Sequence, residues 1–222
     1  MFKIPPPDTQ IDFSVALATV RKQYLQDALS ETVETLDISE VDKLLAATVP
    51  KKCLTALAGH GLRGELMFPV TLLLETNPRL LGYYRLLYGF SRKEFYQSET
   101  GLSRFKSMEE KGNLTLANAK EIASLCEALI PAGAALLDGI GAAMISRQLL
   151  DDLTLLTLGP QFRGGANVKK GIAGIAKVFD AIHEIVKTAT LSVEDNRIEI
   201  KNAAGRTVLI EFSSDPDIIG RL

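Results

Sequence analysis

The sequence predicts a mainly α-helical chain with an α/β portion at its C-terminal end. Apolar residues recur at helical spacing through most of the first 160 positions. The composition then changes at a glycine-rich stretch, Gly159–Gly165. After residue 190, short runs rich in β-branched residues replace the helical spacing. We therefore expect a helical region over residues 1–160, and a second region over residues 161–222 in which one helix precedes an antiparallel meander.

Length and composition indicate a globular protein. The chain has 222 residues, of which 46% are hydrophobic and 23% charged, enough to bury a sizeable core. Its net charge of -2 gives no general attraction to nucleic acid, so a DNA-binding face would have to be local. Cys53 and Cys126 lie in apolar helical surroundings without the spacing of a metal site or redox pair, which is typical of buried thiols.

No targeting segment is expected. Residues 1–10 hold three consecutive prolines and no apolar run of signal-peptide type. The longest apolar stretches are interrupted by Gly, Pro or charge before they reach the roughly 18 residues of a membrane helix. We expect a cytoplasmic protein without a membrane partner.

Capping residues and prolines divide the first region into helices. Asp12 or Ser14 is a plausible N-cap, Pro50 occupies a helix start, and Ser91 is placed to cap a further turn. The expected helices cover residues 12–36, 38–47, 50–59, 78–88, 114–130, 132–145 and 147–158, with Pro131 separating two of them. Residues 66–74 are expected to be extended or mixed, and residues 97–113 to form a polar surface loop.

The second region begins with the expected loop over residues 159–165. A long amphipathic helix follows over residues 168–188. Strands are expected at residues 191–193, 197–202 and 206–212, with Ala203-Ala204-Gly205 forming a hairpin turn. A helix followed by a meander is the opening of a small α/β core.

Acidic residues at the end of the last expected strand are candidate metal ligands. Asp215 and Asp217 follow it, and hard Mg²⁺ prefers carboxylate oxygens. The alternative is an ordinary Asp-Pro turn with solvated carboxylates. Glu184, on the long helix, is a further catalytic candidate, although most glutamates on such helices are solvated. Glu199-Ile200-Lys201 has a Glu-x-Lys spelling, but it precedes Asp217, and we interpret it as an outer hairpin strand.

A basic and aromatic segment, residues 77–111, is the candidate DNA-binding element. It carries seven basic and four acidic side chains, a net charge of +3, interleaved with tyrosines and phenylalanines. Basic side chains neutralise phosphates, and a guanidinium can read guanine in the major groove. The alternative is a core helix whose tyrosines pack and whose arginines extend to the surface. The DNA-binding candidates are Arg79, Arg85, Arg92, Lys93, Arg104, Lys106 and, outside the segment, Arg163.

Four longer strings carry a family resemblance. They are Gly61–Glu65, Leu80–Ser91, Phe105–Gly112 and Leu153–Gly165. With these strings the chain resembles the XcyI family of type II restriction endonucleases, and the likeness extends through the hairpin to Asp217. It covers nearly the whole chain.

The resemblance implies a Mg²⁺-dependent enzyme that cuts both strands of a short palindrome, CCCGGG, in a restriction-modification system. It implies a PD-(D/E)xK nuclease core, in which Pro216-Asp217 matches the PD element. The Glu-x-Lys element of the family lies beyond Leu222, so we expect an incomplete core that is inactive by itself. A palindromic target implies a homodimer on double-stranded DNA.

Two other functions stay open on the sequence. The chain could be a catalytically inactive DNA-binding or dimerisation fragment of such an enzyme. It could also be a helical protein-interaction domain, for which the acidic net charge is the best argument.

Overall fold

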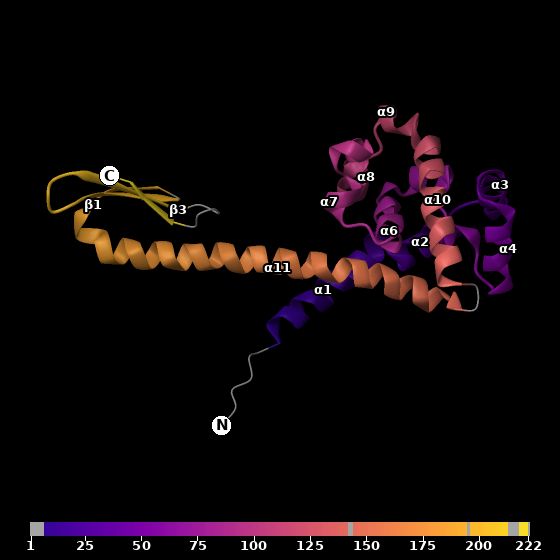
Figure 1. The fold of residues 1–222 in the computed structure, drawn as a ribbon, viewed down its shortest axis with the longest axis horizontal. Helices are drawn as coiled ribbons and strands as arrows, with labels where there is room; N and C mark the ends of the chain where they lie inside the picture. Colours follow the sequence, from indigo (N-terminus) through magenta and orange to yellow (C-terminus); the bar gives the residue numbers. More distant parts are fainter. Residues whose placement is uncertain (1–6, 142–143, 195, 213–217, 222) are drawn as a thin grey trace, which may run out of the picture. The chain divides into compact units, whose positions relative to one another are not determined.

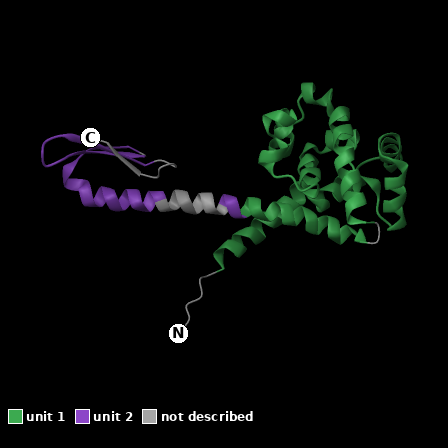
Figure 2. Ribbon diagram, viewed as in Figure 1, with its two compact units in different colours: residues 1–162 green, residues 163–222 purple. Residues whose placement is uncertain are grey.

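The computed structural model describes residues 7–141, 144–194, 196–212 and 218–221. It divides into two compact units, Met1–Phe162 and Arg163–Leu222 (Figure 2). Unit 1 is helical, and unit 2 joins the end of one helix to a small sheet (Figure 1). The fold class of mainly α with a C-terminal α/β portion is therefore confirmed at this level.

The first expected helix is two helices, α1 (Asp8–Tyr24) and α2 (Gln26–Glu34). Leu25 interrupts them with an extended backbone, φ -99 and ψ -163, and its side chain is fully buried. It joins Tyr24, Leu86 and Leu158 in a small apolar cluster. The prediction of one helix over residues 12–36 is wrong because burying Leu25 in this cluster requires a break that helical spacing does not reveal.

The next two helices agree with the prediction. They are α3 (Ile38–Thr48) and α4 (Lys51–Gly59). The Asp37 carboxylate caps α3 by accepting from the backbone N–H of Ser39 at 2.9 Å.

Residues 66–74, expected to be extended or mixed, include the last residue of the short 3-10 helix η1 (Gly64–Leu66) and the start of α5 (Thr71–Thr76). After η2 (Pro78–Leu80) comes α6 (Leu81–Leu87), in which every residue is buried. Gly82 makes this burial possible, because a Cβ there would lie 2.9 Å from the Glu109 side chain. Helix α6 is the centre of unit 1.

Helix α7 (Arg92–Phe95) begins with the expected Ser91 cap, in a reciprocal capping box with Glu94. Residues 97–113 are not the predicted loop. They form η3 (Ser98–Thr100), η4 (Ser103–Phe105) and α8 (Lys106–Lys111). Phe105 and Met108 are buried in the main core, which explains why a polar segment folds into helical turns.

The short α9 (Leu116–Ala119) precedes α10 (Ile122–Ile140), which continues through Pro131 where the sequence predicts a break. The apolar face of α10 packs into the main core, whereas Pro131 is exposed on the other side. Against expectation, α10 is long and apolar enough to cross a membrane by length and composition alone. Its buried residues, among them Ile122, Leu125, Leu129 and Leu137, pack into the main core of unit 1.

Helix α11 (Arg147–Val186) also continues through a predicted boundary, the glycine-rich stretch around Pro160. The separate helices over residues 147–158 and 168–188 and the loop over residues 159–165 are therefore wrong. Leu155, Leu158 and Phe162 share one face and pack against the cluster around Leu25, which favours helix across the proline.

Unit 2 adds a four-stranded antiparallel sheet in the order β1-β2-β3-β4. Its strands are β1 (Thr190–Glu194), β2 (Arg197–Lys201), β3 (Thr207–Phe212) and β4 (Ile218–Arg221). The first three strands and the turn were predicted, and Gly205 adopts φ +75 in that turn. Strand β4 was not predicted; it pairs with β3 from Phe212 and Ile218 to Leu209 and Arg221. The Phe179 ring of α11 packs edge-on against Phe212, with centroids 4.9 Å apart.

Candidate nucleic-acid interface

Arg85 is the most deeply buried of the predicted DNA-binding residues. Its side chain and that of Glu109 are both 0% exposed, and its Nε and Nη2 donate to the two Glu109 carboxylate oxygens at 2.8 and 2.9 Å. Its Nη1 donates to the carbonyl of Phe90 at 2.6 Å. The prediction that Arg85 contacts DNA is corrected, because its guanidinium is committed inside the protein and ties α6 to α8.

Glu109 accepts hydrogen bonds from two further side chains. Tyr96 Oη donates to Oε2 at 2.8 Å, and Arg92 Nε donates to Oε1 at 3.0 Å. Burial alone would raise the pKa of Glu109, but the hydrogen bonds and charge of Arg85, with Tyr96 and Arg92, hold that pKa below its ordinary value. Burial and the neighbouring Glu109 raise the pKa of Tyr96. Glu109 therefore stays ionised and holds Arg92 at the surface.

Arg92 stands at a pocket between α7 and α8 that gathers three of the predicted DNA-binding side chains. The pocket has a volume of about 560 Å³ and is lined by Arg92, Lys93, Tyr96, Gln97, Ser98, Lys106 and Glu110. Arg92 and Lys106 are 44% and 52% exposed, and each lies within 4 Å of Glu110. Lys93 is exposed and has no ion pair among the residues that the structure describes. Such exposed pairs are weak, so phosphate oxygens could replace Glu110 as the partner.

Two more candidates in unit 1 lie outside this pocket. Arg79 Nη1 donates to the backbone carbonyl of Glu110 at 3.1 Å, which places it beside α8. Arg104 forms a two-pronged ion pair with Glu121 and covers the Phe105 ring at 4.9 Å. Arg104 is therefore engaged in fastening η4 to the segment before α10.

In unit 2, Arg163 is an exposed residue of α11. Glu184 lies on the same helix, 74% exposed, and its nearest cation is Lys187 Nζ at 3.4 Å. Asp215 and Asp217, the predicted metal ligands, lie outside the described residues. Among the described residues no group of three or more His, Cys, Asp or Glu side chains could hold a metal ion. The described residues alone do not form a Mg²⁺ site, and the metal prediction depends on Asp215 and Asp217.

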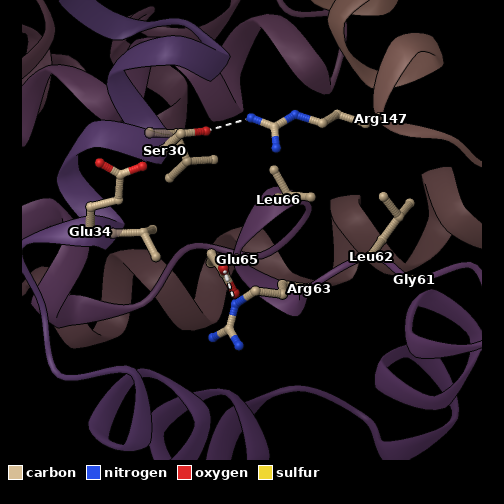
Figure 3. Close-up of a pocket in the computed structure, with 10 residues that line it drawn as sticks. Ser30, Glu34, Gly61, Leu62, Arg63, Glu65, Leu66 and Arg147 are labelled. Carbon is tan, nitrogen blue, oxygen red and sulfur yellow. Dashed lines mark hydrogen bonds and ion pairs between the residues drawn. The ribbon is translucent and has the colours of Figure 1, made fainter.

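A second pocket, of about 290 Å³, lies on unit 1 where sequence reasoning assigned no site (Figure 3). It is lined by Leu29, Ser30, Val33, Glu34, Gly61, Leu62, Arg63, Glu65, Leu66 and Arg147. Arg147 donates to Ser30, and Arg63 donates to Glu65, as Figure 3 shows. The Gly61–Glu65 string was noticed for its family likeness, but no spacing rule brings Arg147 beside it.

Comparison with known proteins identifies the family. The family model described as XcyI restriction endonuclease matches residues 14–221. The type II restriction enzyme Cfr9I of Citrobacter freundii is 54% identical over 219 residues, which cover 98% of this chain and 66% of the relative. The type II restriction enzyme XcyI of Xanthomonas campestris pv. cyanopsidis is 53% identical over the same length, with the same coverage.

The chain thus spans 66% of the length of these two curated relatives. No solved structure matches it. A family model that covers nearly the whole chain, and relatives with more than half of their aligned residues identical, leave one assignment: the chain belongs to the XcyI restriction endonuclease family.

Proposed function

We propose that the chain is part of a type II restriction endonuclease, which binds double-stranded DNA at a short palindrome and hydrolyses a phosphodiester in each strand. The observation that carries this proposal is the identity of 54% to an enzyme of that name over 98% of the chain. The target CCCGGG comes from the family resemblance. The site of action would be the cytoplasm, in a restriction-modification system.

The pocket between α7 and α8 supports the DNA-binding part of the proposal. Lys93, Lys106 and Arg92 present positive charge on one surface of a chain whose net charge is -2. Arg163 would contribute from unit 2 and Arg79 from beside α8. Because a palindrome has two-fold symmetry, a homodimer would place one catalytic centre on each strand.

The catalytic part is proposed from sequence. Asp217, with Asp215, would hold Mg²⁺ in a PD-(D/E)xK core, and Glu184 is the further catalytic candidate. Mg²⁺ bound there would neutralise charge on the phosphate under attack. The second candidate function is a DNA-binding or dimerisation fragment without activity, which the basic side chains at the α7–α8 pocket support without a catalytic centre.

DNA binding is tested by the salt dependence of affinity. We expect the 222-residue chain to bind a CCCGGG duplex with an affinity that falls steeply with salt. Replacing Lys93 and Lys106 together by Ala should make the log-log slope shallower by about 1 to 2, since each phosphate contact contributes about 0.9. Fluorescence anisotropy across a salt series measures the slope.

The matched control is Lys51→Ala, an exposed lysine at the start of α4 that lies outside the α7–α8 pocket. It should leave the slope unchanged. A double variant with the wild-type slope would remove this pocket from the DNA interface. Plasmid cleavage with Mg²⁺, by this chain and by a polypeptide extended to the length of the relatives, separates the endonuclease from the inactive fragment.

A further inference from the structure

The pocket in Figure 3 is lined by Glu65, whose carboxylate has one buried oxygen without a hydrogen-bond partner. Glu65 has a side chain only 4% exposed, and its Oε1 accepts from Arg63 Nε at 2.6 Å. Its Oε2 is the one buried side-chain oxygen or nitrogen without a hydrogen-bond partner in the part of the chain that the structure describes. A buried carboxylate oxygen without a donor is costly, so Glu65 is suited to accept a donor from a ligand that fills the pocket.

Three tyrosines fix the backbone that carries Glu65. Tyr84 Oη donates to the carbonyl of Glu65 at 2.8 Å, while Tyr83 and Tyr88 donate to those of Leu66 and Met67 at 2.7 Å each. All three tyrosines come from α6 and its C-terminal end. With the backbone held in this way, the segment cannot easily turn to give Oε2 an internal partner, and the site is preorganised.

Arg147 supplies a positive charge at the same pocket. Its described hydrogen-bond partners are neutral: Nε donates to Gln26 Oε1 at 3.2 Å and Nη2 to Ser30 Oγ at 2.5 Å. Arg63, in contrast, is paired with Asp42 and Glu65. Arg147 is therefore the lining cation with charge available for an anion, and a guanidinium suits a phosphate.

The remaining lining defines the body of the ligand. Leu29, Val33, Leu62 and Leu66 give an apolar wall suited to the face of a flat ring. Glu34 is an exposed acid of the same lining and would oppose a second phosphate. The pocket thus offers a cation, an apolar wall and a buried acceptor, and these match one phosphate, a planar base and an N–H donor.

We propose that this pocket binds a single nucleotide whose base carries an exocyclic amino group, with cytosine as the best match. Glu65 accepts from the amino group, as carboxylates do from cytosine N4, and Arg147 contacts the phosphate. The nucleotide can be one extruded from bound DNA or a free deoxycytidine monophosphate. That the nucleotide is part of bound DNA rests on the proposed function, whereas the chemical match between nucleotide and pocket is independent of it.

The test compares cytosine with 2-pyrimidinone, which lacks the 4-amino group, both as free nucleotides and at single positions of a CCCGGG duplex. In at least one of these two arms, the wild-type chain should prefer cytosine by about fivefold or more, and Glu65→Gln should lose that preference. Arg63 Nε donates to Oε1 of Glu65 and would hold the amide oxygen of Gln at that place. The amide nitrogen would then take the place of Oε2 and present a donor to the amino group, which is itself a donor. Arg147→Gln should weaken both ligands about equally and keep the preference. The control Glu127→Gln, an exposed residue of α10 with the same change of charge, should match wild type.

The outcomes separate the pocket from the proposed function. Loss of preference in the duplex assigns the nucleotide to DNA; loss only with the free nucleotide supports the pocket with a free ligand. If the chain binds the duplex and Glu65→Gln keeps the wild-type preference for cytosine over 2-pyrimidinone in both arms, the pocket proposal is overturned. The endonuclease proposal then still stands. Cytosine-selective binding of the free nucleotide without any binding of DNA supports the pocket and overturns the DNA-binding part of the proposed function. Should Glu65→Gln fail to fold, unchanged affinity of Arg147→Gln in both arms overturns the inference.

Discussion

Glu109 accepts hydrogen bonds from three side chains, those of Arg85, Arg92 and Tyr96, and so connects α6, α7 and α8. Arg85 is fully buried and depends on this carboxylate for its neutralisation. Glu109 matters for the proposed function because Arg92, which also donates to it, lines the α7–α8 pocket. A single buried carboxylate therefore orders a surface proposed to meet DNA.

We expect Glu109→Ala to lower the free energy of unfolding by about 3 to 5 kcal/mol, because it leaves the Arg85 charge buried and unpaired. Urea unfolding followed by circular dichroism measures the loss. The control is Glu110→Ala. Glu110 is the next residue in the sequence, but its ion pairs with Arg92 and Lys106 are exposed, so we expect a loss of stability of about 1 kcal/mol or less. Equal small losses in both variants would contradict a structural role for the buried pair.

The lowered pKa of Glu109 predicts a dependence of stability on pH. The folded-state pKa lies below the ordinary value of 4.5, so the ionised carboxylate stabilises the fold fully above that pH and progressively less as pH falls through the folded-state pKa. We expect stability to decline below about pH 4.5 and Glu109→Gln to show a shallower decline. Thermal unfolding between about pH 7 and 3 measures this difference.

Some decline should remain in Glu109→Gln. The pKa of Asp37 is lowered chiefly by its hydrogen bond with Ser39, and that of Glu94 chiefly by its hydrogen bond with Ser91. Identical profiles for wild type and Glu109→Gln would show that Glu109 does not contribute to acid unfolding.

At the scale of elements, two prolines lie inside helices that the sequence divides. Pro131 and Pro160 each remove a backbone donor from α10 and α11. Apolar side chains on the buried face of each helix still reach the core, and that burial outweighs the lost hydrogen bond. The cap at Ser91 and the turn at Gly205 were predicted correctly, since their effect is local. The N-cap predicted at Asp12 or Ser14 is wrong, because α1 already begins at Asp8.

We expect Pro131→Ala to raise the free energy of unfolding by about 1 to 3 kcal/mol. Proline is about 3 kcal/mol less favourable than alanine inside a helix, and this position is exposed, so no packing is lost. Thermal and urea unfolding measure the gain. The control Ala128→Gly, exposed on the same helix, should lower stability by about 1 kcal/mol. A destabilised Pro131→Ala would mean that the proline has a role in packing.

At the scale of the whole molecule, the proposed binding pockets and the proposed metal ligands belong to different units. Unit 1 carries the pocket between α7 and α8 and the Glu65 pocket, whereas the proposed metal ligands belong to the residue range of unit 2. The net charge of -2 leaves DNA affinity to local surfaces, so binding and cleavage should be separable by mutation.

In a polypeptide extended to the length of the relatives, we expect Asp217→Ala to reduce Mg²⁺-dependent cleavage of a CCCGGG plasmid at least about a hundredfold, the scale of losing a charge-stabilising group. DNA binding without Mg²⁺ should stay at the wild-type level. The control is Glu199→Ala in β2, whose carboxylate accepts from Ser192 Oγ at 3.0 Å and should not matter for cleavage. Full activity of Asp217→Ala would exclude it from the catalytic centre.

The amino-acid sequence alone determined the family, the change from helices to an antiparallel meander, and most local signals, since capping, turn geometry and periodicity act over a few residues. Only the tertiary structure decided that Arg85 pairs with Glu109 inside unit 1, and that Arg147 and Glu65 line one pocket. The members of these two pairs lie 24 and 82 positions apart in the sequence. A one-dimensional pattern shows that an arginine is present, but packing decides whether water, a carboxylate or DNA surrounds it.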